Sequence, residues 1–238
     1  MKLDILAFGA HPDDVELGCG ATIAKEVALG KKVGIVDLTR GELGTRGSAE
    51  IRDREAKAAG QILGVAVREN LAFADGFFTN DKKHQLEVIK MIRKYQPEIV
   101  LCNTIDDRHI DHAKGSKLVS DACFLSGLIK IETKLEGTIQ ERWRPKLVYH
   151  YMQWKNIEPH FVVSVDGFMD KKEAAILAYK SQFYNPKSSE PETPITSKNF
   201  TESVIYRARD LGRLIGTEYG EGFNVERYPA VESLGDLI

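Results

Sequence analysis

The stretch "FGAHPDDVELGCG", residues 8–20, places a histidine, a proline and two adjacent aspartates directly after a short apolar run. That run, residues 3–10, has the composition of a buried β-strand, so the polar residues stand where the strand ends. Neighbouring carboxylates repel each other, and an ordinary turn needs only one of them as a helix cap. The second aspartate therefore needs another explanation, which depends on what else reaches the same place.

Strand-like and helix-like segments alternate along the rest of the chain. Apolar runs predict further strands at residues 31–39, 69–73, 98–104, 146–152 and 160–165. Amphipathic helices are expected between them, one capped by Ser48 and a last one that carries Val204 and Leu211. The alternation predicts an α/β fold with a Rossmann-like, doubly wound and mostly parallel sheet that has helices on both faces.

No linker or internal repeat divides the chain, so a single domain over residues 1–238 is expected. A chain of this length can bury a large core. Residues 185–199 stand apart because they are polar and rich in proline, and they are predicted to form an exposed loop.

The composition limits the partners and the compartment. The net charge is −2, from 33 Lys and Arg against 35 Asp and Glu. The sequence has no strongly basic block, which argues against nucleic acid as the main partner. The first apolar run is too short for a signal peptide or a membrane span, so no membrane partner is expected. Three cysteines without a CxxC pair indicate a reducing compartment, and we expect a cytoplasmic protein.

A second polar cluster, "TIDDRHIDHAKG" at residues 104–115, follows the predicted strand at residues 98–104. In a doubly wound sheet, binding sites form beyond the carboxyl ends of the strands, where the strand order reverses. If this strand is the neighbour of the first one, the two clusters of histidine and aspartate meet in one crevice.

The residue types in these clusters suit a metal site. His11 and Asp14 would converge with His112, and two imidazoles and a carboxylate fill three positions of a zinc site. The fourth position stays open for water, whose pKa zinc lowers to about 7. Pro12 stiffens the turn, so Asp13 is directed elsewhere and is free to take the proton of that water.

Each cluster by itself also has an ordinary structural explanation. "HPDD" alone is typical of a turn with an aspartate cap, and "DDRHIDH" alone is typical of a solvated helix start. The position of both clusters at strand ends favours the metal site. Cys19 is expected to be a small buried hydrophobic residue. The other histidines are expected at the surface or in structural roles: His84, His150 and His160.

The motifs "AHPDDVELGCGATI" and "RHIDH" resemble the PIG-L/LmbE-like family of zinc-dependent N-deacetylases, which remove acetyl groups from N-acetylglucosamine units. The resemblance continues through "LTRGELGTRG", "IRDREA", "YKSQF", "ETPITS", "RARDLGRLIG" and "EYGEGF", and so covers nearly the whole chain. This full set is most similar to the bacillithiol-biosynthesis deacetylases, which act on N-acetylglucosaminyl-malate. Two departures, Ala21 and Ile110, affect no expected ligand.

The resemblance implies a role for individual residues at the site. One zinc ion per chain would be held by His11, Asp14 and His112, although other divalent metals would also fit. Asp13 would be the general base. His109 would either stabilise the tetrahedral intermediate or protonate the leaving amine. Asp111, between the two histidines, would orient one imidazole.

Four side chains are predicted to bind the substrate: Glu42, Arg46, Arg52 and Arg108. Arg52 matches a family arginine and stands in the first turns of a predicted helix, where a cation costs about 0.3–1 kcal/mol. That cost makes sense if its guanidinium points at a carboxylate. Pairing with Glu55 is the ordinary alternative for Arg52.

These inferences predict a zinc-dependent hydrolase that removes the N-acetyl group from an N-acetylglucosaminide. The expected substrate is N-acetyl-α-D-glucosaminyl L-malate, in bacillithiol biosynthesis, and the family resemblance implies a homo-oligomer, a trimer or a hexamer. A deacetylase of another N-acetylglucosaminyl conjugate stays open, as does a two-metal phosphoesterase with Asp106 and Asp107 as further ligands. A dinucleotide-binding module would need G-x-G-x-x-G after the first strand, where this chain has "GAHPDDVELGCG".

Overall fold

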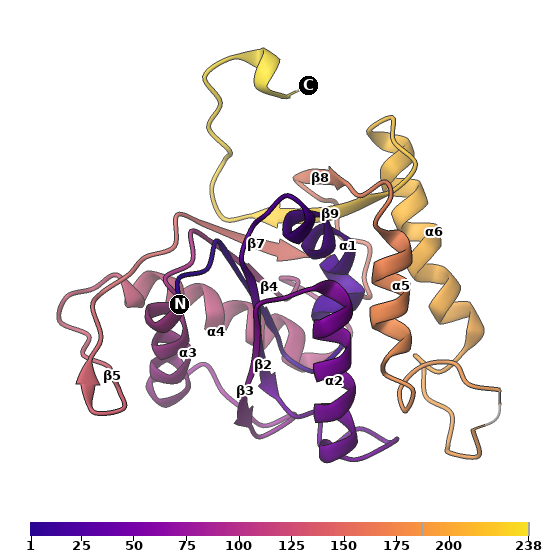
Figure 1. Ribbon diagram of the computed structural model, residues 1–238, viewed down its shortest axis with the longest axis horizontal. Coiled ribbons are helices and arrows are strands. Elements are labelled where there is room, and N and C mark those ends of the chain that lie inside the picture. The colour runs from indigo at the N-terminus through magenta and orange to yellow at the C-terminus, as the bar shows by residue number, and fades with distance from the viewer. Residues whose placement is uncertain (187, 238) are drawn as a thin grey trace.

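A computed structural model describes residues 1–186 and 188–237, and its centre is a seven-stranded sheet of order β3-β2-β1-β4-β7-β9-β8 (Figure 1). The strands are β1 (Ile5–Gly9), β2 (Val33–Thr39), β3 (Val67–Phe73), β4 (Ile99–Cys102), β7 (Leu147–Tyr151), β8 (Phe161–Ser164) and β9 (Gly220–Val225). From β3 to β7 all neighbours pair in parallel, whereas β9 runs antiparallel to both β7 and β8. The prediction of a mostly parallel sheet is confirmed.

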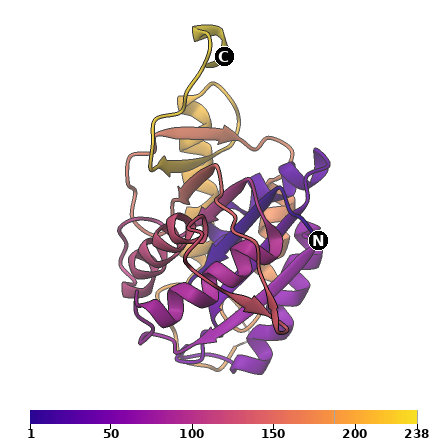
Figure 2. The same ribbon diagram turned by 90° about the vertical axis from the view of Figure 1, so that its left-hand side faces the viewer.

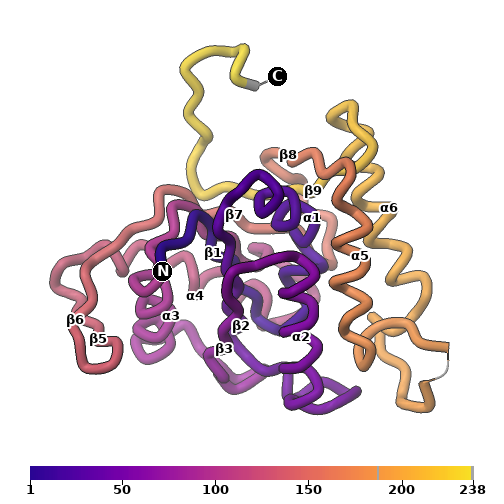
Figure 3. The backbone as a smooth tube through the Cα atoms, viewed as in Figure 1, coloured from indigo at the N-terminus to yellow at the C-terminus, as the bar shows by residue number. Residues whose placement is uncertain are grey.

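Helices cover both faces of this sheet, as predicted. They are α1 (Asp14–Ala28), α2 (Ala49–Leu63), α3 (Lys82–Tyr95), α4 (Ile110–Ser126), α5 (Met169–Leu177) and α6 (Lys198–Leu214). Helices α1, α2 and α5 pack together on one side, α3 and α4 on the other, and α6 packs on β9 (Figures 1 and 2). A small hairpin of β5 (Lys134–Leu135) and β6 (Thr138–Ile139) projects beside α3, as the tube in Figure 3 shows.

The side chains on the two faces of the central strands pack into two separate hydrophobic cores. In β1, Leu6 and Phe8 pack with α3 and α4, while Ile5 and Ala7 pack with α1 and α2. Successive side chains of a strand point to opposite faces, so a strand buried on both faces must be apolar throughout. This is why the first strand reads as an uninterrupted apolar run in the sequence.

The helix cap predicted at Ser48 is confirmed. The hydroxyl of Ser48 accepts a hydrogen bond from the Ile51 amide at 3.3 Å and caps α2, as predicted.

The apolar patterns do not predict β5, β6, α5 or β9. Strand β9 contains glycine, glutamate and asparagine, which disfavour strands, and there is little space at its Gly222, where a Cβ would lie 2.5 Å from Met152 Sδ and 3.0 Å from Pro159 Cβ.

Helix α1 is interrupted at Cys19, whose φ of −145° and ψ of 24° are not helical. Glu221, from β9, accepts hydrogen bonds from the amides of Ala21 at 3.2 Å and Thr22 at 2.7 Å, and so caps the second half of the helix. Buried Lys172 lies 2.5 Å from the Glu221 carboxylate and neutralises it. Strand β9 therefore fixes the helix that begins at the candidate site.

We expect Gly18→Ala to destabilise the protein, because a methyl group there would overlap the buried ring of Tyr151. The Tyr151 hydroxyl is itself held by a 2.8 Å hydrogen bond to the Phe8 carbonyl, so the ring has little freedom to move. Overpacking of this kind costs about 1–3 kcal/mol in the free energy of unfolding, measurable by urea denaturation. Gly20→Ala is the matched control, since its nearest neighbour would be Lys172 Cγ at 3.4 Å. An equal loss in both variants would contradict the explanation.

Within the described residues, none of the helices combines the length and the apolar character needed to cross a membrane.

Candidate active site

The condition for the two polar clusters to meet is fulfilled, because β1 pairs in parallel with β4. The strand order reverses between them, since β2 lies on the other side of β1. Their carboxyl ends open into a cavity of about 690 Å³. The cavity is also lined by residues of the loop after β2, of the segment before α6 and of α6 itself. This is the place where doubly wound sheets bind ligands.

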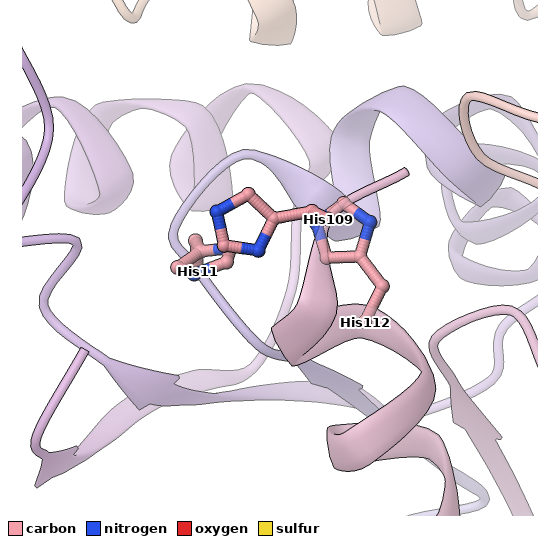
Figure 4. A group of neighbouring side chains, drawn as sticks. All are labelled: His11, His109 and His112. Atoms are coloured by element: carbon pink, nitrogen blue, oxygen red, sulfur yellow. The ribbon is translucent and has the colours of Figure 1, made fainter. Parts of the chain in front are cut away.

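The structure brings together the three predicted metal ligands. Asp14 lies between the two imidazoles: its Oδ2 is 3.5 Å from His11 Nδ1 and its Oδ1 is 3.1 Å from His112 Nε2. Figure 4 shows His11 beside His109 and His112, and ring nitrogens of these histidines lie within 4.8 Å of one another. One residue of this cluster precedes α1, and the others come from the start of α4.

This donor set suits zinc in both chemistry and spacing. Zinc–ligand bonds of about 2.0–2.1 Å at tetrahedral angles place the ligand atoms about 3.3 Å apart. The two distances from Asp14, 3.5 Å to His11 and 3.1 Å to His112, lie on either side of that value. The two distances end on different oxygens of Asp14, so an ion held by all three side chains would have to draw one of these oxygens toward both rings.

Asp14 is held in place by neutral donors as well as by the histidines. Its carboxylate accepts hydrogen bonds from the His11 amide at 2.9 Å, from Asn103 Nδ2 at 3.0 Å and from Gln153 Nε2 at 2.9 Å. Burial acts to raise the pKa of Asp14, but the charge of His112 and the hydrogen bonds with both histidines hold it well below its ordinary value. Asp14 is therefore ionised, and the same contacts raise the pKa of His112 to about 9, so a metal ion would have to displace a proton from that ring.

Carboxylates also support the far sides of the two imidazoles. Asp107 Oδ2 lies 2.5 Å from His112 Nδ1, and Asp75 Oδ1 lies 3.1 Å from His11 Nε2. Asp111, expected to orient an imidazole, lies 3.4 Å from the same nitrogen of His11. Such contacts fix the tautomer and the orientation of a ligating ring. Asp75 and Asp107 in this role were not foreseen: Asp75 is distant in sequence, and Asp107 was considered only as a second-metal ligand.

Asp106 and Asp107, considered as ligands of a second metal, have other partners in the structure. Asp107 is the partner of His112, and Asp106 is exposed and accepts hydrogen bonds from Lys155 Nζ at 2.9 and 2.8 Å. A carboxylate that is engaged by a lysine at the surface is a poor candidate for binding a cation. The geometry therefore does not support Asp106 and Asp107 as ligands of a second metal ion.

Asp13 differs from Asp14 in conformation and environment. Its φ of 110° is rare for a residue other than glycine and turns it out of helix α1, which it precedes. Burial raises the pKa of Asp13 to about 7, although the Arg52 guanidinium, 3.0 Å away, acts in the opposite direction. A carboxylate with a pKa near neutrality that lines the cavity is suited to proton transfer.

His109 directly precedes α4 as its N-cap residue, next to the predicted ligands. Its ring centroid is 4.5 Å from that of His11 and 5.1 Å from that of His112. Burial and the charges of these two rings lower the pKa of His109, so its neutral form is favoured. Its Nδ1 accepts a 3.3 Å hydrogen bond from the Asp111 amide, which places the proton of the neutral ring on Nε2. His109 can therefore donate a hydrogen bond to a substrate oxygen.

Arg52 points into the site and does not pair with Glu55. It donates hydrogen bonds to the Pro12 carbonyl at 2.6 Å, to Asp13 Oδ2 at 3.0 Å and to Gln182 Oε1 at 3.0 Å. Glu55 instead accepts hydrogen bonds from the amide and hydroxyl of Ser181, at 2.8 and 2.7 Å. Arg52 is thus placed to lower the pKa of Asp13, the residue predicted to be the general base.

The other three predicted substrate residues are placed differently. Arg108 lines the cavity, whereas Glu42 and Arg46 are absent from the described residues that line it. Arg46 donates hydrogen bonds to the carbonyls of Pro191 at 2.6 Å and Glu190 at 3.1 Å, so it holds the loop that precedes α6. Glu42 accepts a 2.8 Å hydrogen bond from the Asp75 amide. Both support walls of the site from behind.

Comparisons with known proteins identify relatives of this chain. The family model described as "GlcNAc-PI de-N-acetylase" (PIG-L) matches residues 6–123. An uncharacterised deacetylase, YaiS of Escherichia coli, is 41% identical over 125 residues, which are 50% of this chain and 67% of YaiS. The diacetylchitobiose deacetylase of Thermococcus kodakarensis is 28% identical over 190 residues, 75% of this chain and 70% of that enzyme.

A solved structure is similar over the whole length. The conserved protein TT1542 of Thermus thermophilus superposes with a TM-score of 0.85 at 36% identity, covering 98% of both chains. The matched segment of the family model contains both histidine and aspartate clusters of the cavity. With its sheet order, its strand-end cluster and these similarities, the chain belongs to the PIG-L family of de-N-acetylases.

Proposed function

We propose that this protein is a zinc-dependent hydrolase that removes the N-acetyl group from an N-acetylglucosaminide and releases acetate and a free amine. The observation that carries the proposal is the arrangement of Asp14 between His11 and His112, with the raised-pKa carboxyl of Asp13 in the same cavity. The matching family model is described as a de-N-acetylase, and the Thermococcus relative is a deacetylase of an acetylated sugar by name.

The residues of the cavity divide the work of amide hydrolysis. A zinc ion held by His11, Asp14 and His112 would supply Lewis acidity for the acetyl carbonyl and for the attacking water. Asp13 takes the proton of that water and returns it to the nitrogen of the leaving amine. Arg52 opposes the effect of burial and keeps a fraction of Asp13 ionised near neutral pH.

His109 acts on the oxygen of the tetrahedral intermediate. Of its two predicted roles we favour stabilisation, because its lowered pKa leaves the ring neutral with a proton on Nε2. A neutral imidazole donates a hydrogen bond to the developing negative charge without having to lose a proton.

The aglycone is proposed to be anionic, and the expected substrate is N-acetyl-α-D-glucosaminyl L-malate of bacillithiol biosynthesis. Support comes from the motif resemblance and from Arg108, an exposed cation in the cavity wall. The diacetylchitobiose deacetylase of Thermococcus supports the remaining alternative, an N-acetylglucosaminyl conjugate with a neutral aglycone.

A comparison of three substrates tests the proposal: the malate glycoside, its dimethyl ester and diacetylchitobiose. One bidentate contact between arginine and carboxylate contributes about 1.5–3 kcal/mol. The malate glycoside should therefore exceed its dimethyl ester by about ten- to a hundredfold in kcat/KM, measured by amine release. Equal rates would overturn the anionic aglycone and leave the deacetylase, while no amine release from any of the three would overturn the deacetylase.

We further propose that the enzyme acts in the cytoplasm as a homo-oligomer, a trimer or a hexamer. The free state of the buried thiols Cys19, Cys102 and Cys123 supports a reducing compartment. Sedimentation equilibrium of the purified protein gives the number of subunits directly.

A further inference from the structure

Arg108 differs from the other arginines of the cavity wall. The guanidinium groups of Arg52 and Arg207 donate hydrogen bonds to other residues of the protein. Arg108 is exposed at the wall, and within residues 1–186 and 188–237 its guanidinium makes no hydrogen bond or ion pair. Its donors are therefore available to a ligand in the cavity.

Arg108 is nevertheless not a loose surface side chain. Its Cζ lies 4.6 Å from the centroid of the Trp154 ring, which stacks on Phe200 with a centroid distance of 5.5 Å and an interplanar angle of 18°. Phe200 in turn stacks on Phe183 at 6.1 Å and 1°. Phe183 is only 2% exposed and belongs to the core beside α1, α2 and α5. A column of stacked groups thus connects the buried core to Arg108.

The segment that carries Trp154 is fixed to the metal cluster. Arg207 donates hydrogen bonds to the carbonyls of Gln153 and Trp154, the latter at 2.8 Å. Asp107, the partner of His112, also accepts hydrogen bonds from the amides of Trp154 at 3.4 Å and Lys155 at 3.0 Å. The indole therefore holds a defined position relative to the candidate metal ligands.

We propose that Trp154 is a positioning residue that holds Arg108 over the cavity, and that this pair selects substrates whose aglycone carries a carboxylate. The inference rests on the proposed function and names the residues behind its specificity. A guanidinium held over an aromatic ring by cation–π attraction uses none of its N–H groups on a hydrogen-bond partner, so they stay available for contact with a carboxylate. Holding the long side chain in advance also removes part of the entropy that binding would otherwise cost.

The test measures kcat/KM of the metal-loaded protein for the malate glycoside and for its dimethyl ester. In Trp154→Ala the ratio of the two values should fall about tenfold, mainly through a higher KM for the malate glycoside, because Arg108 loses its support. Trp154→Phe keeps a ring face and should restore most of the ratio. Arg108→Ala should abolish the preference, and the double variant should show no further loss, since both residues act as one unit.

Lys155→Ala is the matched control. It removes a positive charge next to Trp154, but Lys155 is paired with Asp106 and lies outside the described cavity lining, so the substrate ratio should stay at the wild-type value. Equal losses on both substrates in Trp154→Ala, or a full ratio in Arg108→Ala, would overturn the inference. A wild-type ratio of one overturns it as well.

Failure of the proposed function gives a different result, because then no substrate releases amine. Calorimetric binding of the malate glycoside to the wild type, Trp154→Ala and Arg108→Ala then decides the inference without turnover. Weaker binding in both variants, with Lys155→Ala unaffected, supports it, and unchanged binding in either variant overturns it.

Discussion

His112→Ala is expected to lose bound metal and deacetylation together. The substitution removes one of three converging ligands and leaves the Asp107 carboxylate without the ring nitrogen that it contacts at 2.5 Å. Loss of a group that only supports a ligand already costs about 10–100-fold in metal affinity or activity, so loss of a ligand itself should cost more. Metal per chain after dialysis, measured by mass spectrometry, and kcat measured on the same samples check this expectation.

His84→Ala is the control for that experiment. His84 lies at the start of α3, where its ring contacts the Asp81 cap at 2.9 Å, and it has no place in the cavity wall. This variant should keep its metal and its rate. If His112→Ala retained one metal per chain, the assignment of His112 as a ligand would be wrong, whatever the effect on kcat.

Asp13→Asn should keep the metal and lower kcat by about 10²–10⁴-fold, because it removes the proposed general base. Asparagine is the appropriate substitution, since it tolerates the positive φ of 110° at this position and retains a hydrogen-bond acceptor for Arg52. Metal content, kcat and circular dichroism separate a loss of catalysis from a loss of structure. Loss of metal in Asp13→Asn would show instead that Asp13 is a ligand.

The pH profile gives an independent check on Asp13. A general base acts in its ionised form, so wild-type kcat/KM should decrease as the pH falls through the pKa of Asp13, which burial raises. The residual activity of Asp13→Asn should lack this acid limb. An identical acid limb in both proteins would assign the titration to another group.

The sequence by itself determined the fold class and the place of the site. The apolar runs predicted strands that are buried on both faces. The carboxyl ends of parallel strands lie at one edge of a sheet, which is where a binding site forms. The two clusters that contain His11 and His112 therefore had to meet once β1 and β4 were neighbours. Part of the proposed metal site is local, because His11 and Asp14 lie within one turn of the chain.

Only the tertiary structure decided the partners of these residues. Asp75 reaches His11 across 64 positions of sequence, and Gln153 reaches Asp14 across 139. Likewise, Arg52 donates a hydrogen bond to Asp13 and does not pair with Glu55, its neighbour on the same helix. Strand β9 forms from residues with little intrinsic preference for strands. Periodicity describes which face of its own element a side chain occupies. Which side chains meet across elements depends on how those elements cross, and only the folded chain fixes that.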